Sequence, residues 1–298
     1  KKDFMLRVRS ESLLAMLERE DTVILGTLTL IRCQNIISII CLHKKSCILG
    51  RMYLMKYNMM VVFNSSYFPF GRLWINSLYD KNNMSNVDKV FIVDTGLKKE
   101  EKEYFKSKGS EVHIYDTGLD TDFNDGGAWG KGWQENVGSK TIIFQHLLSM
   151  TDIPLMMVDG DCIFVKDLYP LIDSHCDIQL CKRDAGTPYL GSFVIGQPRQ
   201  QTLDFMTKWI ERIATKPTNV PRESPSLSEV AMEEWSNLSI GNIDRLLVST
   251  HNENEYGEHT YIVHLKSATV DRKIDSRLRK YLIESPNFQT MIKEYSDV

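Results

Sequence analysis

The stretch Leu155-Met-Met-Val-Asp159-Gly-Asp161-Cys-Ile-Phe-Val165 decides how the rest of the sequence is interpreted. Residues 154–158 form a short apolar run without alternation, which is typical of a strand buried on both faces. Asp159 and Asp161 follow directly and are separated by one glycine. Because residues i and i+2 of an extended segment point to the same side, both carboxylates are expected to project together from the end of a central strand.

Two neighbouring carboxylates repel each other unless a cation lies between them, and hard oxygen ligands favour Mg²⁺ or Mn²⁺. A divalent ion held in this way keeps open positions that suit a diphosphate. Asp-Gly-Asp is also good turn chemistry, so a solvated turn is the simpler alternative. The apolar runs on both sides favour the metal site, because a turn between two buried segments usually lies at the edge of a pocket.

The composition excludes several other classes of protein. The 298 residues carry a formal net charge of −3, which gives no general attraction to nucleic acid or to an anionic membrane. The six cysteines include no C-x-x-C pair, so we expect a reducing, cytoplasmic location. Residues 23–42 are the longest apolar stretch, but Arg32 at its middle would cost about 2.5–3.5 kcal/mol in a bilayer. We therefore expect no transmembrane segment.

The first part of the chain differs in character from the rest. Residues 1–57 contain three of the six cysteines and the basic cluster at 43–45. They are expected to be an N-terminal extension or the end of a preceding domain, and their role is not readable. The region 58–298 is expected to form the main domain.

A regular alternation of strands and helices begins at Met59. Predicted strands at 59–63, 89–93 and 111–115 alternate with predicted helices at 70–79 and 97–108, which indicates a parallel sheet with right-handed crossovers.

Ligands of such sheets bind outside the carboxyl ends of the strands. Asn64, Asp94 and Asp116 follow the ends of three predicted strands, as Asp159 follows a fourth. We expect these polar side chains to share one edge of the sheet, although polar residues are ordinary at any single strand end.

The segment after the third strand is predicted to be a loop beside the site. Residues 118–138 are polar and rich in glycine, and Ser139 is predicted to cap the next helix. Lys140 would then lie in the first turn, where a lysine opposes the helix dipole, and this indicates an anionic partner.

In the last third of the chain, Gly191 allows close backbone approach within one predicted strand. Further strands are predicted at 177–182, 189–195, 243–248 and 260–265, with helices at 168–172, 202–214 and 229–235, a Pro-rich link at 216–225 and a helical tail from 271.

This order of elements resembles a glycosyltransferase of the GT-A fold over about residues 59–266. The most specific parts are residues 157–165, with Asp-x-Asp, and the late run 261–266, with His264. The resemblance implies an α/β fold in which helices cover both faces of a mixed, mainly parallel, Rossmann-like sheet. It also implies that 58–298 is the transferase domain.

The resemblance further implies roles for single residues. Asp159 and Asp161 would bind the metal ion and diphosphate of a nucleotide sugar, and His264 would complete the shell of Mn²⁺ or Mg²⁺. The residues implied in binding the donor are Asn64, Asp94, Lys140, Asp159, Gly191 and Lys266. A single histidine on an apolar strand is also common as a structural residue.

The catalytic residues implied are Asp161 and Glu229. Glu229 is expected at the start of the helix after the Pro-rich link, where inverting members place a base. Glu233 and Glu234 are its rivals, and a carboxylate at a helix start is also ordinary.

The reaction expected is transfer of a sugar, of the hexosyltransferase type, from a UDP-sugar in preference to a GDP-sugar. The acceptor (glycan, lipid or protein), the stereochemistry and the oligomeric state stay open. One alternative is a phosphatase of the haloacid-dehalogenase type, which also uses Asp-x-Asp but has Thr-Leu or Thr-Val in the place of Cys162 and Ile163. A sugar nucleotidyltransferase lacks support because residues 64–69 are not its basic glycine-rich loop. The non-enzyme alternative is a domain that binds nucleotide sugars without turnover.

Overall fold

The computed structural model describes residues 56–119, 131–184, 186–217, 222–266 and 285–296. All but the last two residues of the predicted N-terminal extension lie outside this part, as does much of the predicted loop 118–138. Within the described residues, every helix is too short or too polar to cross a lipid bilayer.

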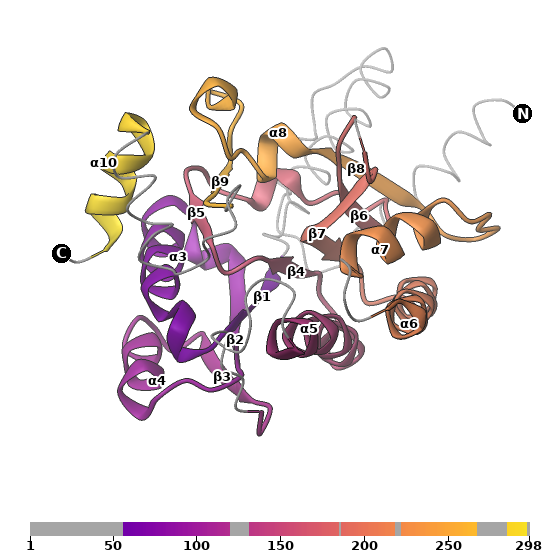
Figure 1. Ribbon diagram of the computed structural model, residues 1–298, viewed down its shortest axis with the longest axis horizontal. Coiled ribbons are helices and arrows are strands. Elements are labelled where there is room, and N and C mark those ends of the chain that lie inside the picture. The colour runs from indigo at the N-terminus through magenta and orange to yellow at the C-terminus, as the bar shows by residue number, and fades with distance from the viewer. Residues whose placement is uncertain (1–55, 120–130, 185, 218–221, 267–284, 297–298) are drawn as a thin grey trace, which may run out of the picture. The chain divides into compact units, whose positions relative to one another are not determined.

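A seven-stranded sheet forms the centre of the domain, in the order β3-β2-β1-β4-β7-β6-β8 (Figure 1). The neighbouring strands β3, β2, β1 and β4 are all parallel. The strand β7 is antiparallel to both β4 and β6, and β8 is parallel to β6. The mixed, mainly parallel sheet predicted from the sequence is therefore confirmed. The strands are β1 (Tyr57–Phe63), β2 (Val87–Asp94), β3 (Val112–Asp116), β4 (Leu155–Val158), β6 (Ile178–Lys182), β7 (Tyr189–Gly196) and β8 (Ile240–Asp244).

A second, two-stranded sheet pairs β5 (Cys162–Phe164) with β9 (Ile262–His264) in antiparallel fashion. It begins one residue after Asp161, so the Asp-Gly-Asp segment is the connection between the two sheets. Its register places Cys162 opposite His264.

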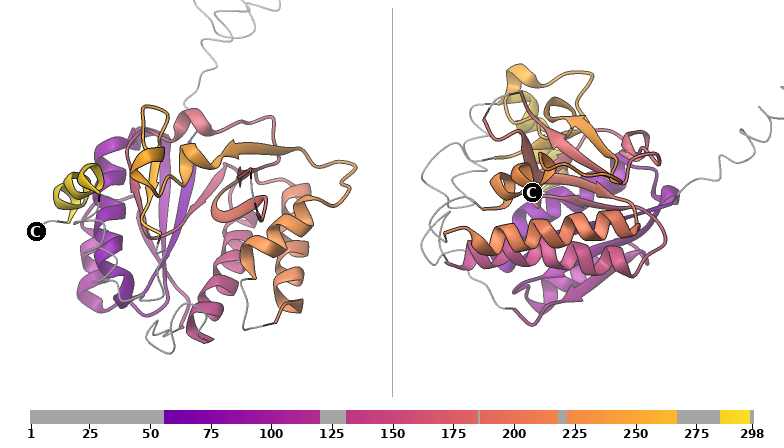
Figure 2. Two further views of the ribbon diagram at one scale, coloured as in Figure 1. Left: turned by 45° about the horizontal axis from the view of Figure 1, so that its top comes forward. Right: turned by 90° about the vertical axis from the view of Figure 1, so that its right-hand side faces the viewer.

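Helices cover both faces of the large sheet, which explains why the central strands β1, β4 and β7 are buried along almost their whole length. In β1, Met59 and Val61 pack with one buried cluster and Met60 packs with the other. One face carries α3 (Phe68–Lys81) and α4 (Lys99–Lys106), and the opposite face carries α5 (Lys131–Ser149), α6 (Gln200–Thr215) and α7 (Glu223–Ala231), as Figures 1 and 2 show.

The helix α10 (Pro286–Tyr295) packs beside α3 (Figure 1). Tyr295 donates its hydroxyl to Asp80 at 2.7 Å, and Asn76 donates to the carbonyl of Tyr295 at 2.8 Å. At the other end, Glu253 accepts hydrogen bonds from the backbone and side chain of Asn287 at 2.8 and 2.7 Å. The prediction of a helical tail is confirmed for this part of it.

Three predicted boundaries are wrong. The helix α5 already begins at Lys131, so Ser139 lies inside it and Lys140 is not in its first turn. The helix α7 begins at Glu223 and ends at Ala231, instead of covering 229–235. The strand β8 ends at Asp244, and the predicted remainder forms the short helix α8 (Arg245–Val248).

Candidate active site

The carboxyl ends of β1, β2, β3 and β4 meet at one edge of the sheet because these strands are parallel. The strand order changes direction between β1 and β4, since the chain runs outward to β3 and then returns to the other side of β1. Ligands of open α/β sheets bind at such a switch point. Asn64 and Asp159 follow its two strands.

Asn64 and Asp94 hold the loops at this edge. The Asn64 side chain accepts a hydrogen bond from the backbone of Tyr67 at 3.0 Å. Asp94 is 2 % exposed, accepts from the backbone of Gly96 and Leu97 at 2.9 and 2.7 Å, and pairs with Lys102. Both side chains therefore shape the edge.

Asp159 and Asp161 both face the imidazole of His264. His264 Nε2 lies 3.0 Å from Oδ1 of Asp161 and 3.7 Å from Oδ2 of Asp159. The backbone of Leu265 donates to the carbonyl of Asp161 at 2.8 Å, which ties the end of β9 to the Asp-Gly-Asp connection. Two separate parts of the chain thus deliver two carboxylates and one imidazole to the same place.

Packing explains the glycine between the two aspartates. A Cβ at Gly160 would lie 2.6 Å from Cε1 of Phe63 and 3.2 Å from the carbonyl oxygen of Val62. Phe63 cannot easily yield, because its ring stacks on Phe105 at a centroid distance of 5.4 Å. The close approach to β1 therefore needs a residue without a side chain here.

Ser249 orients the ring of His264. Its hydroxyl lies 2.9 Å from His264 Nδ1, and both residues are almost completely buried. When Nδ1 carries the proton, it donates to Oγ of Ser249. The lone pair of Nε2 then faces the two carboxylates. This is the tautomer that binds a metal ion through Nε2.

Lys140 lies on the other side of Asp159. Its amino group is 2.7 Å from Oδ1 of Asp159 and 2.6 Å from Oε1 of Glu223, and it donates to the carbonyl of Gly191 at 3.2 Å. Burial by itself lowers the pKa of Lys140, but the charges of Asp159 and Glu223 outweigh it, so the pKa is raised and the side chain is a permanent cation. The cation occupies one oxygen of Asp159 and leaves the other facing His264.

Glu223 is a site residue that the sequence did not reveal. Burial raises the pKa of its carboxyl group to about 7, although the positive charges of Lys140 and Lys266 oppose that shift. A Cβ at Gly191 would lie 2.5 Å from Cδ of Glu223, so Gly191 makes room for this carboxylate. The close backbone approach expected at Gly191 is thus to Glu223 and to Lys140.

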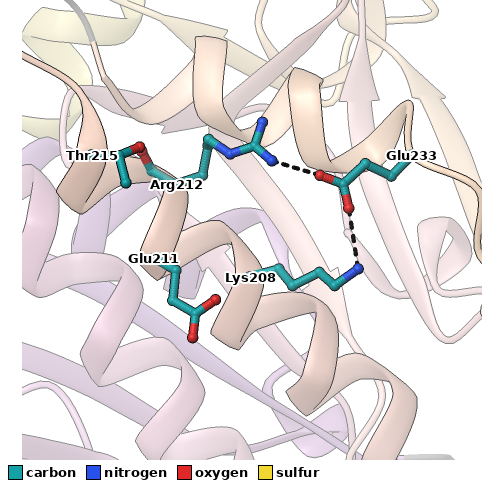
Figure 3. Close-up of a pocket in the computed structure, with 5 residues that line it drawn as sticks. All are labelled: Lys208, Glu211, Arg212, Thr215 and Glu233. Atoms are coloured by element: carbon teal, nitrogen blue, oxygen red, sulfur yellow. Dashed lines mark hydrogen bonds and ion pairs between the residues drawn. The ribbon is translucent and has the colours of Figure 1, made fainter.

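Glu229 faces a different part of the surface. Its carboxylate pairs with Arg212 at 2.8 Å and also with Lys216, and its side chain is 41 % exposed. Arg212 also pairs with Glu233 beside a surface depression between α6 and the residues just after α7, in which Lys208 and Arg212 both point to Glu233 (Figure 3). The structure brings Lys140, Asp159, Asp161, Gly191 and His264 together but leaves Glu229 with this charged surface.

The donor set fits a hard divalent cation. An oxygen of Asp161 and an oxygen of Asp159 lie 3.0 and 3.7 Å from Nε2 of His264, and the two carboxylates would repel each other unless positive charge lies among them. Mn²⁺ accepts this combination of oxygen and imidazole ligands. Asp159, Asp161 and His264 are therefore the residues that could hold such an ion.

The family described as nucleotide-diphospho-sugar transferase matches residues 98–276, which is more than half of the 298 residues. This range contains both aspartates and His264. No curated protein matches the sequence.

Several solved glycosyltransferases share the fold. The galactosyltransferase LgtC in complex with donor and acceptor sugar analogues aligns with a TM-score of 0.55 and 8% identity, over 81% of this chain and 97% of that one. The apo structure of the bifunctional glycosyltransferase WbbM aligns with a TM-score of 0.51 and 10% identity, over 80% of this chain and 51% of that one. The glycosyltransferase GlyE from Streptococcus pneumoniae TIGR4 aligns with a TM-score of 0.50 and 12% identity, over 82% of this chain and 64% of that one.

The alignment thus spans about half the length of WbbM and nearly all of LgtC. At these identities the structural similarity shows the fold alone, whereas the assignment to the family rests on the match to the sequence of the chain. The chain adopts the GT-A fold and belongs to the nucleotide-diphospho-sugar transferase family of glycosyltransferases.

Proposed function

We propose that the protein transfers a sugar from a UDP-sugar to an acceptor hydroxyl, with a divalent cation, Mn²⁺ or Mg²⁺, at Asp159, Asp161 and His264. The observation that supports it best is the convergence of these three side chains at the switch point of the sheet. The family match removes the phosphatase alternative, because haloacid dehalogenases are a different family.

The bound cation would neutralise charge on the diphosphate as it leaves the sugar. The residues of the chain do the rest. Lys140 supplies a second, fixed positive charge next to Asp159 and needs no reorganisation during the reaction, since it is already held by Glu223 and Gly191. Ser249 keeps Nε2 of His264 turned toward the aspartates.

Four other residues complete the proposed donor site. Asn64 and Asp94 would shape the surface for the base and ribose through the loops that they hold. Gly191 would act through its backbone, which leaves room for Glu223 beside the donor site, and the exposed Lys266 would meet phosphate oxygens. UDP is preferred to GDP in this proposal on the frequency of such donors in the fold family.

The reaction also needs a carboxylate on the side of the sugar that faces the acceptor. The resemblance to the GT-A fold implies this role for Glu229 at the start of its helix, but α7 begins at Glu223. Glu223 is therefore the first residue to test for this role, and Glu229 is the second.

Residues 58–298 are proposed as the transferase domain, which includes the whole range that matches the family. A reducing compartment, the cytoplasm, agrees with the free thiols of Cys162, Cys176 and Cys181. The acceptor class, a glycan, a lipid or a protein, is left open.

Isothermal titration of the full chain with UDP and with GDP, each with and without Mn²⁺, tests the proposal. The expected result is UDP binding that requires Mn²⁺ and is stronger than GDP binding. Hydrolysis or transfer of the sugar from a UDP-sugar, followed by release of UDP, then separates an enzyme from a domain that only binds. Nucleotide binding that is unchanged by Mn²⁺ and by chelator would contradict the metal-dependent mechanism.

A further inference from the structure

The thiol of Cys162 takes no part in the function proposed above, although it lies beside the site. Asp161, Cys162 and His264 each present a metal-ligand atom, and these three atoms lie within 4.8 Å of one another. All three residues are buried, at 8 %, 1 % and 1 % exposure. The pairing of β5 with β9 fixes Cys162 directly opposite His264.

From this geometry we infer that Asp161, Cys162 and His264 form a zinc site that overlaps the site proposed for the donor's cation. An imidazole nitrogen, a thiolate sulfur and a carboxylate oxygen are ligands that Zn²⁺ accepts together in tetrahedral sites. Mn²⁺ prefers oxygen ligands and binds a given set of protein ligands more weakly than Zn²⁺. The thiol therefore changes which metal this end of the site prefers.

The distances allow such a site with small movements. Tetrahedral bonds of about 2.0–2.3 Å place pairs of ligand atoms roughly 3.3–3.8 Å apart, so the side chains must close by no more than about 1.5 Å. The thiol proton is released to solvent when the zinc–sulfur bond forms. Three protein ligands would leave the fourth position to water, and of the three the side chain of Asp161 is in contact with solvent, at 11 % exposure.

Zinc and the catalytic cation would exclude each other. Both use Asp161 and His264, and only Asp159, which is held by Lys140, belongs to the donor's cation alone. Zn²⁺ would thus inhibit by occupying two of three ligands. This competition rests on the proposed function, whereas the zinc site itself does not.

The simpler alternative is that Cys162 is only a core residue. It packs in the buried cluster that also contains Phe164 and Trp74. Cys181 on β6 is a matched control, because it is a free, fully buried cysteine of the same cluster and has no place in the group of ligands.

Titration of the full chain with Co²⁺ tests the inference directly. A cobalt–thiolate bond gives a strong charge-transfer band in the near ultraviolet that oxygen and nitrogen ligands do not give. The expected result is such a band, complete at one equivalent of Co²⁺ and abolished by one equivalent of Zn²⁺. Binding of Co²⁺ without this band in the unaltered protein would overturn the inference, and this outcome depends on no variant.

Two variants assign the sulfur. Cys162→Ser should lose the band and bind Zn²⁺ at least about tenfold more weakly in competition with a chromophoric chelator, while Cys181→Ser keeps both properties. If Cys162→Ser does not fold, Cys162→Ala serves instead, with thermal unfolding as the check. Equal losses in the Cys162 and Cys181 variants would also overturn the inference.

The unaltered protein separates the two proposals. Mn²⁺-dependent binding of UDP without a thiolate band refutes the zinc site alone. A thiolate band without Mn²⁺-dependent binding of UDP refutes the proposed function alone. When both are present, one equivalent of Zn²⁺ should weaken the Mn²⁺-dependent binding of UDP, and unchanged binding would refute the overlap of the two sites.

Discussion

The carboxylate of Glu223 lies 2.6 Å from the amino group of Lys140, and the exposed fractions of the two side chains are only 12% and 8%. The two residues come from α7 and α5, which lie on the same face of the sheet. Asp159 completes the arrangement from the end of β4. A buried cation between two carboxylates is stable only as a set, because loss of one member leaves uncompensated charge away from water.

Lys140→Met should therefore destabilise the fold by about 3–5 kcal/mol, since it leaves the buried Glu223 and the partly exposed Asp159 without their cation. Urea unfolding monitored by circular dichroism measures this free energy. Lys208→Met is the matched control, because Lys208 pairs with Glu233 on the surface and its side chain is 48 % exposed. Exposed pairs contribute about 0–1 kcal/mol, so equal effects of both substitutions would contradict a structural role for the buried pair.

Asp161→Ala should weaken Mn²⁺-dependent binding of UDP by at least about 100-fold, because it removes one of three ligands and leaves His264 without its carboxylate partner. Isothermal titration measures the loss, and transfer of the sugar should disappear with it. Asp152→Ala, which removes an exposed carboxylate shortly before β4, should leave both unchanged. Equal affinity of the Asp161→Ala variant and the unaltered protein would refute the central assignment.

Gly160→Ala should destabilise the protein by about 1–3 kcal/mol and weaken the binding of Mn²⁺, because the new Cβ would lie 2.6 Å from the ring of Phe63 and would push the two aspartates away. The control is Gly138→Ala inside α5, where a Cβ would meet nothing within 4 Å. That change should stabilise the helix by about 0.5–1 kcal/mol. Thermal unfolding orders the two variants, and a neutral Gly160→Ala would contradict the packing argument.

The ion pair of Glu255 with Arg245 gives the fold a dependence on pH. Hydrogen bonds from Arg245, at 2.8 and 2.9 Å, lower the pKa of Glu255 to about 2. The unfolded carboxyl group titrates near 4.5, so the stabilisation is complete above about pH 4.5 and is lost as the pH falls toward 2. The substitution Glu255→Gln should therefore lower the free energy of unfolding by more at pH 7 than at pH 3.5.

Urea unfolding at the two pH values measures this difference. Glu258→Gln, which changes an exposed carboxylate close by, is the control and should show the same small effect at both. A loss for Glu255→Gln that is the same at pH 3.5 and pH 7 would show that the pair does not lower the pKa of Glu255.

The sequence revealed the half of the fold in which local pattern and tertiary role agree. The strands β1, β2 and β4 each contain a short apolar run, and a polar residue lies at or directly after the end of all four parallel strands, so their shared edge could be predicted from the sequence. The Asp-Gly-Asp segment was recognisable for the same reason, since both of its flanking strands are buried.

Helix starts were harder to predict because glycine and proline allow more than one outcome. The glycine-rich pattern predicts that Gly138 belongs to a loop, but one glycine costs a helix only about 1 kcal/mol, and α5 continues through it. The pattern predicts that Pro225 ends a link, yet Pro225 lies in the first turn of α7, where the missing N–H of proline costs the helix no hydrogen bond. Because α7 begins earlier than predicted, its first residue is Glu223 and not Glu229.

The side chains that contact the predicted site residues could not be predicted from the sequence. Glu223 meets Lys140, and Ser249 meets His264, only because separate helices and strands pack together, and a single sequence contains no signal for such distant pairs. A buried glutamate in a first helical turn looks the same in the sequence as a solvated one.

The reversed direction of β7 has a practical consequence for engineering. Because β7 runs against β4, its first residues reach the same edge as Asp159, whose backbone donates to the carbonyl of Ser192 at 2.9 Å. The ends of β6 and β7 at Lys182 and Tyr189 therefore lie at the same edge of the sheet as the proposed site. Libraries that vary the length and composition of the connection between β6 and β7 would change which acceptors are used, while the strands of the sheet stay unaltered.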